Sequence, residues 1–407
     1  MSAVWIINQY ATTPDTGMGG RHHYLAKELA KLGHDVTLIS ARWHHLIRDD
    51  VRAASAPAVE ERDGYNFVRV PVPQYSHAHD KRRVLNWLLF GRRLRHLPRR
   101  LGKVPDTILY SSPSLMGFGG AERLARKIGA RLVFEVRDIW PLTLHEVGGQ
   151  SQNHPLMVWM QRIEDRAYRV SDAVLSNLPN AVDHMVARGL DRRKFTWVPN
   201  GFDRDELENP EPLGEMAAAA LPSGKFLIGY TGTIGTANAL ETLVGAAEKI
   251  KDHKDIAFVV VGSGRERDRI AIEIERRNLS NIHLIGPIPK RQVQSMLAQF
   301  DACVICWQDK PLYRFGTAAN KIPEYLFSGR PILSSFTGYG DLVEGYGAGI
   351  CVAAEDPTAL AEAVLQLKSL SNSERFQMGE RGRKASIDNH QYSALALRLE
   401  SVLFGNL

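Results

Sequence analysis

The chain has 407 residues, of which 44% are hydrophobic and 24% are charged. This composition excludes a disordered or fibrous protein, and the length predicts two domains of about 150–200 residues each. The 51 basic and 45 acidic residues leave a net charge of +6, which does not indicate a dedicated nucleic-acid-binding protein unless the excess is concentrated in one segment.

Cysteine usage and the opening residues predict a cytoplasmic protein. Only Cys303, Cys306 and Cys351 are present, too few for a disulfide scaffold, which favours a reducing compartment. The first basic residue is Arg21 and the opening apolar run is short, so no leader is expected. No stretch of 18 apolar residues predicts a membrane span.

The first half of the chain has the pattern of a doubly wound α/β domain. Residues 4–10 form an apolar run, glycines at 17–20 break it, leucines at helical spacing follow, and residues 35–40 form a second short run. The runs at 131–136 and 173–176 have the composition of buried parallel strands.

The glycine loop at 17–20 is the first candidate ligand site. Gly19 and Gly20 precede a helix, where backbone amides and the helix dipole favour a phosphate group. The loop departs from the dinucleotide fingerprint, because His22 replaces the third glycine and no acid ends the second strand. This argues against a nicotinamide oxidoreductase. His22 and His23 are candidates to border an acceptor, and an ordinary turn remains the alternative.

Positive charge is concentrated between Lys81 and Lys103, which hold nine Lys or Arg residues and no acid. Apolar residues are interleaved with these cations, a pattern that suits an anionic membrane surface, and Pro98 is expected to interrupt the helix. The candidate membrane residues are Arg82, Arg83, Trp87, Arg92 and Arg93. The alternative is a solvated basic helix whose leucines belong to the core.

The second half restarts the α/β pattern after a Pro-, Gly- and Ala-rich stretch at 209–224, which predicts a second domain. Its strands are expected at 226–230, 257–261, 282–285, 302–306, 331–334 and 349–352, and its helices include 239–250, 265–277 and 291–299. A second glycine loop follows its first strand and contains Gly232, Thr233 and Gly235.

The segment 313–331 carries the most informative chemistry. Lys321 and Glu324 lie three residues apart, hence on one face of a helix. A lysine can carry the charge of a leaving phosphate, and a carboxylate can accept two sugar hydroxyls. A simple Lys–Glu surface pair is the alternative.

The chain resembles the bacterial surface-polysaccharide glycosyltransferases of glycosyltransferase family 4, and the resemblance runs over nearly its whole length. The matching pieces are residues 17–20, 137–141, 198–203, 262–264, 320–325 and 329–331. The segment 137–141, Arg-Asp-Ile-Trp-Pro, is similar to the branch that adds amino or deoxy sugars to lipid-linked O-antigen and capsule precursors.

The resemblance implies the α/β fold called GT-B, in which two Rossmann-like domains face a central cleft. We expect an acceptor-binding domain at 1–205, a nucleotide-sugar-binding domain at 206–385, and a C-terminal helix at 386–407 that packs back on the first domain. The family's Glu-x7-Glu motif has Gly316 in its first position, so the donor sugar is expected to be held by backbone amides of residues 315–320.

The resemblance also assigns roles. Lys321 would carry the diphosphate charge, because the family's usual Arg and Lys pair is missing from 233–240, and Arg265 or Arg137 could help. Glu324 would hold the ribose, and the base would lie near Ile288. The remaining donor-side candidates are Phe315, Gly316, Thr317 and Asn320.

Asp138 ends an apolar strand and could orient or deprotonate the acceptor hydroxyl, with Arg137 beside it as an acceptor-side candidate; a helix N-cap is the bland alternative. Asp203-Arg204-Asp205 spells a metal motif of another fold, but it follows an Asn-Gly turn and heads a helical stretch, so no metal site and no cofactor is expected.

The sequence therefore predicts a retaining, metal-independent enzyme that transfers a sugar, with UDP as the expected carrier, to a polyprenyl-diphosphate-linked glycan at the inner face of the cytoplasmic membrane. The alternatives are a GT-B nucleotide-sugar 2-epimerase, which needs no acceptor, and a non-catalytic membrane-associated assembly protein.

Overall fold

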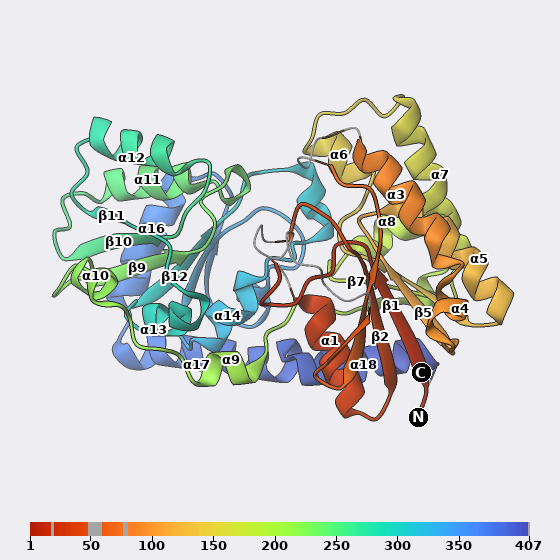
Figure 1. Cartoon of the computed structure of the whole chain (residues 1–407). Coiled ribbons are helices and arrows are strands. Elements are labelled where there is room, and N and C mark those ends of the chain that lie inside the picture. The colour runs from red at the N-terminus through yellow and green to blue at the C-terminus, as the bar shows by residue number, and fades with distance from the viewer. Residues whose placement is uncertain (18–19, 48–58, 76–79, 81, 406–407) are drawn as a thin grey trace. The chain divides into compact units, whose positions relative to one another are not determined.

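The computed structural model describes residues 1–17, 20–47, 59–75, 80 and 82–405. It divides the chain into two compact units, one of residues 1–199 with 392–407 and one of residues 200–391. Each unit is described by itself (Figure 1).

The first unit is built on an eight-stranded sheet with the order β3-β4-β2-β1-β5-β6-β7-β8. Its neighbouring strands are parallel except for the antiparallel pair β3 and β4. The strands are β1 (Ala3–Asn8), β2 (Asp35–Ala41), β3 (Val59–Arg62), β4 (Tyr65–Val70), β5 (Thr107–Ser111), β6 (Arg131–Val136), β7 (Ala173–Ser176) and β8 (Phe195–Trp197).

Helices cover both faces of this sheet, which explains why its central strands are apolar on both sides. On one face α1 (Arg21–Lys31) packs against α18 (Tyr392–Phe404), and leucines of both helices join the core beneath them. The other helices of this unit are α3 (Arg82–Leu94), α4 (Leu97–Leu101), α5 (Phe118–Ile128), α6 (Leu142–Glu146), α7 (Pro155–Val170) and α8 (Ala181–Ala187). Figure 1 shows α3, α5 and α7 on the side away from α1 and α18.

The second unit has a six-stranded parallel sheet with the order β11-β10-β9-β12-β13-β14. The strands are β9 (Phe226–Thr231), β10 (Ile256–Val261), β11 (Ile282–Ile285), β12 (Ala302–Cys306), β13 (Ile332–Ser335) and β14 (Gly349–Val352). The helices are α9 (Arg204–Glu208), α10 (Glu215–Ala219), α11 (Leu240–Lys249), α12 (Arg267–Arg276), α13 (Val293–Leu297), α14 (Lys321–Phe327), α15 (Leu342–Gly345), α16 (Pro357–Ser369) and α17 (Asn372–His390).

Two hydrophobic cores lie on opposite faces of this second sheet. Residues of α11 and α16, such as Leu243 and Leu360, fill one core, and residues of α13 and α14, such as Met296 and Leu326, fill the other. Alternate residues of β10 enter the two cores, with Phe258 in the first and Val259 in the second.

The unit boundaries fall near, but not at, the expected positions 205 and 385. Phe202 and Leu207 pack with Phe327 of α14, so the segment that leads into α9 belongs to the second unit. α17 starts with a capping box formed by Ser371 and Glu374 and continues to His390, so the chain leaves this unit at residue 391 rather than 385. α18 then joins the first unit, where the rings of Tyr392 and Tyr24 stack at 4.8 Å.

Candidate functional site

Each sheet has one point at which the strand order reverses direction along the chain. In the first unit this point lies between β1 and β5, and in the second it lies between β9 and β12. Open parallel sheets bind ligands outside the carboxyl ends of their strands at such points. Lys321 lies at the point in the second sheet, and His22 lies at the point in the first.

Lys321 lies at the reversal point of the second sheet. The first residue of α14, it donates hydrogen bonds from Nζ to Tyr230 Oη at 2.7 Å and to Asn238 Oδ1 at 2.9 Å. The ammonium also lies 4.2 Å from the centroid of the Tyr230 ring. These partners fix the charge beside the loop after β9.

Burial strongly perturbs this lysine. Desolvation lowers the pKa of Lys321 to about 7, and the nearby Cys306 thiol opposes the shift only in part. Neither hydrogen-bond partner carries a negative charge, so an anion that arrives beside Nζ would favour the protonated form.

The glycine loop after β9 is held by a second glycine loop after β10. Gly232 and Gly262 have φ values of +145° and +147°, a region that favours glycine. A Cβ on Gly262 would lie 1.9 Å from the carbonyl oxygen of Gly232, so the two backbones can approach only without that side chain. Tyr325 of α14 donates its hydroxyl proton to the Thr231 carbonyl at 2.7 Å, which joins α14 to the same loop.

Glu324 has a different partner from Lys321, although both belong to α14. Lys290, in the turn after β11, forms an ion pair with Glu324 Oε1. The Lys321–Glu324 surface pair, the alternative interpretation of their spacing, is therefore not what occupies either side chain. The carboxylate is instead joined to the loop that contains Ile288, which is half-buried against the neighbouring core.

The other donor-side candidates surround this centre less tightly. Asn320 accepts a hydrogen bond at Oδ1 from Asn200 Nδ2 at 2.9 Å, and Phe315 is buried with Arg314 over its ring. Gly316 has φ +88°. Thr233, Gly235 and Thr317 lie in the loops before α11 and α14. Arg265, the expected helper for the diphosphate charge, is largely exposed and donates to Thr236 Oγ1 at 2.7 Å.

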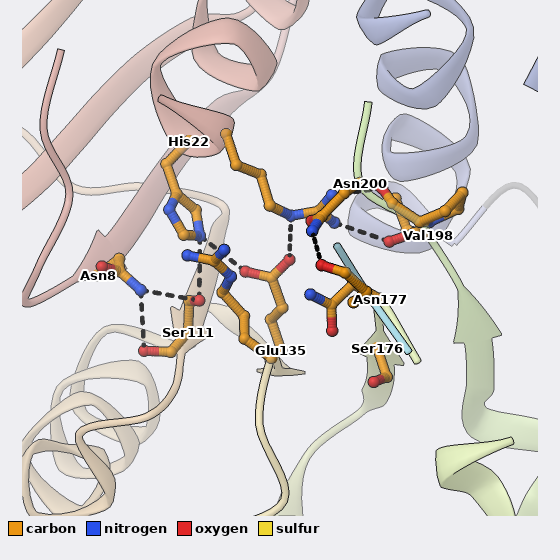
Figure 2. A network of polar contacts seen from close by, with 12 residues as sticks. Asn8, His22, Ser111, Glu135, Ser176, Asn177, Val198 and Asn200 are labelled. Carbon is orange, nitrogen blue, oxygen red and sulfur yellow. Dashed lines mark hydrogen bonds and ion pairs between the residues drawn. The ribbon is translucent and has the colours of Figure 1, made fainter. Parts of the chain in front are cut away.

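A buried polar network occupies the reversal point of the first sheet (Figure 2). The Glu135 carboxylate at the end of β6 accepts from Arg21 Nε at 2.9 Å, and its second oxygen lies 2.7 Å from His22 Nε2. His22 Nε2 is also 3.0 Å from Ser111 Oγ at the end of β5, and Asn8 at the end of β1 donates to the same hydroxyl. The network joins three adjacent strand ends to the start of α1.

The pKa values of Glu135 and His22 are both lowered in this network, but for different reasons. Burial alone would raise the pKa of Glu135, but Arg21 and His22 outweigh it and hold that pKa well below its ordinary value. Burial lowers the pKa of His22 despite the opposing charge of Glu135. At neutral pH the carboxylate is therefore ionised and the imidazole is neutral.

The remaining acceptor-side candidates have separate positions. His23 faces Tyr65, with Nδ1 2.8 Å from its hydroxyl, and burial lowers the pKa of His23 as well. Asp138 is exposed just after β6, and its neighbour Arg137 donates its backbone N–H to Ser112 Oγ at 2.9 Å. Gly20 is the N-cap of α1 with φ +128°, while Gly19 lies outside the described residues.

The basic segment contains α3 and α4, with Pro98 in the first turn of α4, while Lys81 lies outside the described residues. The structure corrects one part of the interpretation of this segment. Trp87 is only 6% exposed, and its indole donates to Tyr10 Oη. Arg83 also donates to Tyr10 Oη, at 2.9 Å. Arg83 and Trp87 point toward the interior of the first unit, because helical spacing places them on the same face of α3 as the buried Phe90. Arg82 is exposed, and so are Arg92 and Arg93, although Arg93 also donates to the Pro71 carbonyl.

Several residues of the two networks were missed in the sequence. Glu135 lies inside an apolar run, where an acid is out of place, and that signal could have identified it. Tyr230 and Asn238 carry no such signal, because a tyrosine in a strand and an asparagine in a loop are ordinary. Asp203, in the suspected metal motif, caps α9 by accepting from the Asp205 N–H at 2.9 Å.

Two family descriptions match the chain in tandem. Residues 16–201 match the "Glycosyl transferase 4-like domain", and residues 225–369 match "Glycosyl transferases group 1". The two matches include Arg21, His22 and Glu135 of the first unit and Lys321 and Glu324 of the second, but not Asn8 of β1.

Curated relatives are distant. WcaI of Escherichia coli, named as a colanic acid biosynthesis glycosyl transferase, is 23% identical over 275 residues, which are 64% of this chain and 66% of that protein. A GDP-mannose-dependent alpha-mannosyltransferase of Mycolicibacterium smegmatis is 24% identical over 248 residues, or 60% of this chain and 58% of that protein. The matches thus span less than two thirds of the length of these relatives.

Solved structures resemble the chain along nearly its full length. Sucrose-phosphate synthase from Thermosynechococcus elongatus has a TM-score of 0.76 at 19% identity, and both chains are covered completely. Anabaena HepE in complex with UDP and glucose also covers both chains completely, with a TM-score of 0.66 at 13% identity. WaaG, involved in lipopolysaccharide biosynthesis, has a TM-score of 0.64 at 15% identity and covers 99% of this chain and all of its own. At these identities the likeness establishes the fold, and it confirms the two-sheet architecture expected from the sequence.

Proposed function

Because the chain belongs to the family 4 glycosyltransferases and has their GT-B fold, we propose that it transfers a sugar from a UDP donor to a polyprenyl-diphosphate-linked glycan. Family 4 enzymes retain the anomeric configuration of the sugar. The proposed product is a precursor of a surface polysaccharide, and the Arg-Asp-Ile-Trp-Pro segment at 137–141 favours an amino or deoxy sugar as the group transferred.

The observation that carries the proposal is the setting of Lys321. Its ammonium is held between Tyr230 and Asn238 at the carboxyl edge of the second sheet, beside the two glycine loops. A diphosphate bound at this edge would lie beside the positive charge of Lys321 and would accept hydrogen bonds from backbone N–H groups of the loops. These contacts would stabilise the diphosphate as a leaving group when its bond to the sugar breaks. No divalent cation is needed for this role.

Glu324 would bind the ribose hydroxyls, and the turn that carries Ile288 and Lys290 would border the base. The ion pair between Lys290 and Glu324 places the carboxylate beside that turn. Gly316 stands where the family motif has its first Glu, so N–H groups of residues 315–320 would hold the donor sugar.

The acceptor would bind to the first unit, where Asp138 offers an exposed carboxylate that can orient a sugar hydroxyl. Arg137 precedes it at the carboxyl end of β6, and its charge acts on the Asp138 carboxylate. The relatives named for colanic acid and for lipopolysaccharide biosynthesis support a glycan acceptor.

The exposed side of α3 would bring the enzyme to the lipid that carries its acceptor. Leu85 and Leu88 are 51% and 39% exposed, and Arg82, Arg92 and Arg93 flank them. None of the described helices is both long and apolar enough to cross a bilayer.

A thermal-shift screen of nucleotide sugars tests the donor, because a ligand that binds only the folded protein raises its melting temperature. UDP-sugars are expected to raise it and dTDP-sugars are not. If only GDP-sugars raise the melting temperature, the proposed carrier changes from UDP to GDP, the nucleotide in the names of the mannosyltransferase relatives. A flat response to UDP-, GDP- and dTDP-sugars would overturn the proposal.

Turnover provides the second test. Donor-dependent release of UDP is expected only after lipid extract is added, and EDTA should leave the rate unchanged because Lys321 supplies the positive charge. Conversion of the donor to an epimer without an acceptor would contradict the proposed transfer.

A further inference from the structure

Three aromatic side chains gather at the carboxyl edge of the second sheet, beside the Lys321 centre. Trp307 directly follows β12, Phe336 directly follows β13, and Tyr313 belongs to the turn Pro311–Phe315. The centroid of the Trp307 ring lies 5.5 Å from that of Tyr313 and 6.1 Å from that of Phe336, and the last two are 5.9 Å apart. These spacings are those of packed aromatic pairs. All three residues are half-buried, so this aromatic cluster keeps an accessible side.

Backbone hydrogen bonds hold the aromatic cluster in place. The Trp307 N–H donates to the Ser335 carbonyl at 3.1 Å, which joins the ends of β12 and β13. The Tyr313 carbonyl accepts from the N–H of Tyr339 at 3.0 Å and from the N–H of Gly316 at 2.9 Å. The three rings are therefore fixed in position before any ligand binds, as is common for the walls of ligand pockets.

The aromatic cluster is continuous with the proposed donor site. Cys306, the residue before Trp307, lies near Lys321, and its thiol acts on the charge of the lysine. Gly316, which is hydrogen-bonded to the turn that carries Tyr313, belongs to the segment 315–320 proposed to hold the donor sugar. A sugar attached to a diphosphate beside Lys321 would therefore lie within reach of the aromatic cluster, inside the second unit.

The aromatic cluster combines apolar ring surface with unused polar groups. Within the described residues, neither the Trp307 indole N–H nor the Tyr313 hydroxyl has a hydrogen-bond partner. Burial raises the pKa of Tyr313, so its hydroxyl stays protonated at neutral pH. The indole nitrogen can only donate, whereas the phenol oxygen can also accept. An acetamido group matches this set, because its methyl packs on the rings, its carbonyl accepts from the indole, and its N–H donates to the phenol.

We propose that the aromatic cluster of Trp307, Tyr313 and Phe336 binds an acetamido group on the donor sugar and so selects an N-acetylated amino sugar. This inference rests on the proposed transferase function and deepens it, because it chooses between the amino and the deoxy sugar considered there. The methyl of a deoxy sugar has no amide for the indole and the phenol. The three aromatic residues set specificity, and Lys321 remains the residue that binds the diphosphate.

Affinity for paired donors tests the selection without any acceptor. UDP-N-acetylglucosamine is compared with UDP-glucose, and UDP-N-acetylgalactosamine with UDP-galactose, so that each pair differs only in the acetamido group. A pocket distinguishes ligands that differ by one apolar group by about tenfold or more. In at least one pair, the acetamido donor is therefore expected to bind about tenfold more tightly than the hydroxyl donor. Equal affinities within both pairs would overturn the proposal.

Two further donors separate the acetamido group from other substituents. UDP-glucosamine carries a free amine, which the charge of Glu355 near Tyr313 would attract, and UDP-6-deoxyglucose carries a methyl without an amide. Both are expected to bind more weakly than the preferred acetamido donor. If either one binds as tightly, the aromatic cluster recognises a cation or a plain methyl group, and the proposal is wrong.

Trp307 can report contact with the sugar directly. The chain contains seven tryptophans, and in protein labelled with 5-fluorotryptophan the ¹⁹F signal of Trp307 is assigned by its loss in Trp307→Phe. The preferred acetamido donor should shift this signal, and UDP alone should leave it nearly unchanged. A shift of the same size with UDP alone would mean that the ring responds to the nucleotide, which would contradict a contact with the acetamido group.

Substitutions that keep the rings test the polar groups. Trp307→Phe removes the indole N–H and Tyr313→Phe removes the hydroxyl, and each should reduce the preference for the acetamido donor by about two- to tenfold. Affinity for UDP alone and the melting temperature should change little. The matched control is Trp159→Phe, because Trp159 is a 42% exposed tryptophan of α7 in the other unit. Full preference in both Trp307→Phe and Tyr313→Phe would overturn the proposal.

The outcomes are distinguishable from failure of the proposed function. UDP alone should bind to the unmodified protein and lose affinity in Lys321→Ala, whether or not the aromatic cluster recognises the sugar. If UDP binds in this way and the paired donors bind equally, only the role of the aromatic cluster is excluded. If neither UDP nor any UDP-sugar binds, the proposed donor is wrong as well.

Discussion

Lys321 combines a positive charge with surroundings that oppose it. Its partners Tyr230 and Asn238 are neutral, and burial lowers its pKa to about 7. In the unfolded chain the same lysine has a pKa of about 10.4. Between these values the unfolded state holds more protons, so the donor-free protein should gain stability as pH rises from about 7 to about 10.

Donor binding should reverse this preference and take up a proton. A diphosphate beside Nζ favours the ammonium, so UDP binding near pH 8 is expected to be accompanied by proton uptake and to weaken as pH rises further. Calorimetric titration in buffers of different ionisation enthalpy measures the uptake. It should vanish in Lys321→Ala, and an uptake that persists there would assign the proton to another group.

Lys321→Ala also measures how much the lysine contributes to the affinity for UDP. Loss of a charge-assisted contact costs about 1.5–3 kcal/mol, so Lys321→Ala should weaken UDP binding by about tenfold to 150-fold. The unfolding midpoint should stay near that of the unmodified protein, since the substitution also removes a buried charge.

The close approach of Gly262 to the Gly232 carbonyl gives a prediction that depends on backbone geometry rather than on charge. An alanine there would place Cβ 1.9 Å from the Gly232 carbonyl and would keep a φ of +147° that disfavours a side chain. Gly262→Ala should therefore displace the loop after β9 and abolish the UDP-induced thermal shift. Gly345→Ala is the control in the same unit, because its Cβ would meet nothing within 4 Å.

At the residue scale, the sequence identified charged groups better than their partners. Lys321 was singled out by its spacing to Glu324 and by the family resemblance, and His22 by its place just after the first glycine loop. The hydroxyl of Tyr230 and the amide of Asn238 become partners only through the folding of β9 and the following loop against α14, and no local pattern encodes that approach.

α3 shows how an element acquires two different faces. Its inward side carries Asn86, Trp87, Phe90, Gly91 and Leu94, and its outward side carries Leu85 and Leu88 with arginines. The backbone of Gly91 lies so close to α5 that a Cβ on Gly120 would be 2.1 Å from the Gly91 carbonyl. The apolar residues are nearly continuous in the sequence, so only this packing decides which of them face solvent.

The outward side of α3 should bind anionic vesicles. In flotation with phosphatidylglycerol-containing vesicles, a Leu85→Ser, Leu88→Ser double variant is expected to lose most of its bound fraction. Leu397→Ser is the matched control, because Leu397 is a 55% exposed leucine elsewhere in the same unit. Equal binding by the double variant and the control would exclude α3 as the contact, and absence of binding by the unmodified protein would exclude the membrane role.

At the scale of the whole molecule, the alternation of strands and helices made the two-sheet architecture predictable. Apolar runs such as 302–306 coincide with β12, and 282–285 with β11. The unit boundaries were less predictable, because Phe202 and His390 look like ordinary residues of a linker and a helix. Their assignment depends on contacts with α14 and with the backbone near Asn200.

The two units should differ when the chain is cut. Residues 200–391 are continuous and contain both of their own cores, so this segment alone is expected to unfold cooperatively and to bind UDP. A chain that ends at residue 391 lacks Leu395, Leu399, Val402 and Leu403, all fully buried in the first unit.

Each of these side chains contributes about 1.5–3 kcal/mol when buried, and together they match the total stability of a typical domain, about 5–15 kcal/mol. The truncated chain should therefore lose the first unit's unfolding transition in calorimetry while it keeps that of residues 200–391. Two intact transitions would contradict this account of α18.

The return of the chain at Tyr392 also orders events during synthesis on the ribosome. The second unit can close its sheet as soon as residue 391 has emerged, whereas α1 waits for α18, which is made after the whole of that unit. The core beneath α1 is therefore completed only after the second unit has been synthesised. Until then the leucines of α1 lack their cover, and chaperones that shield exposed apolar surface would act on α1.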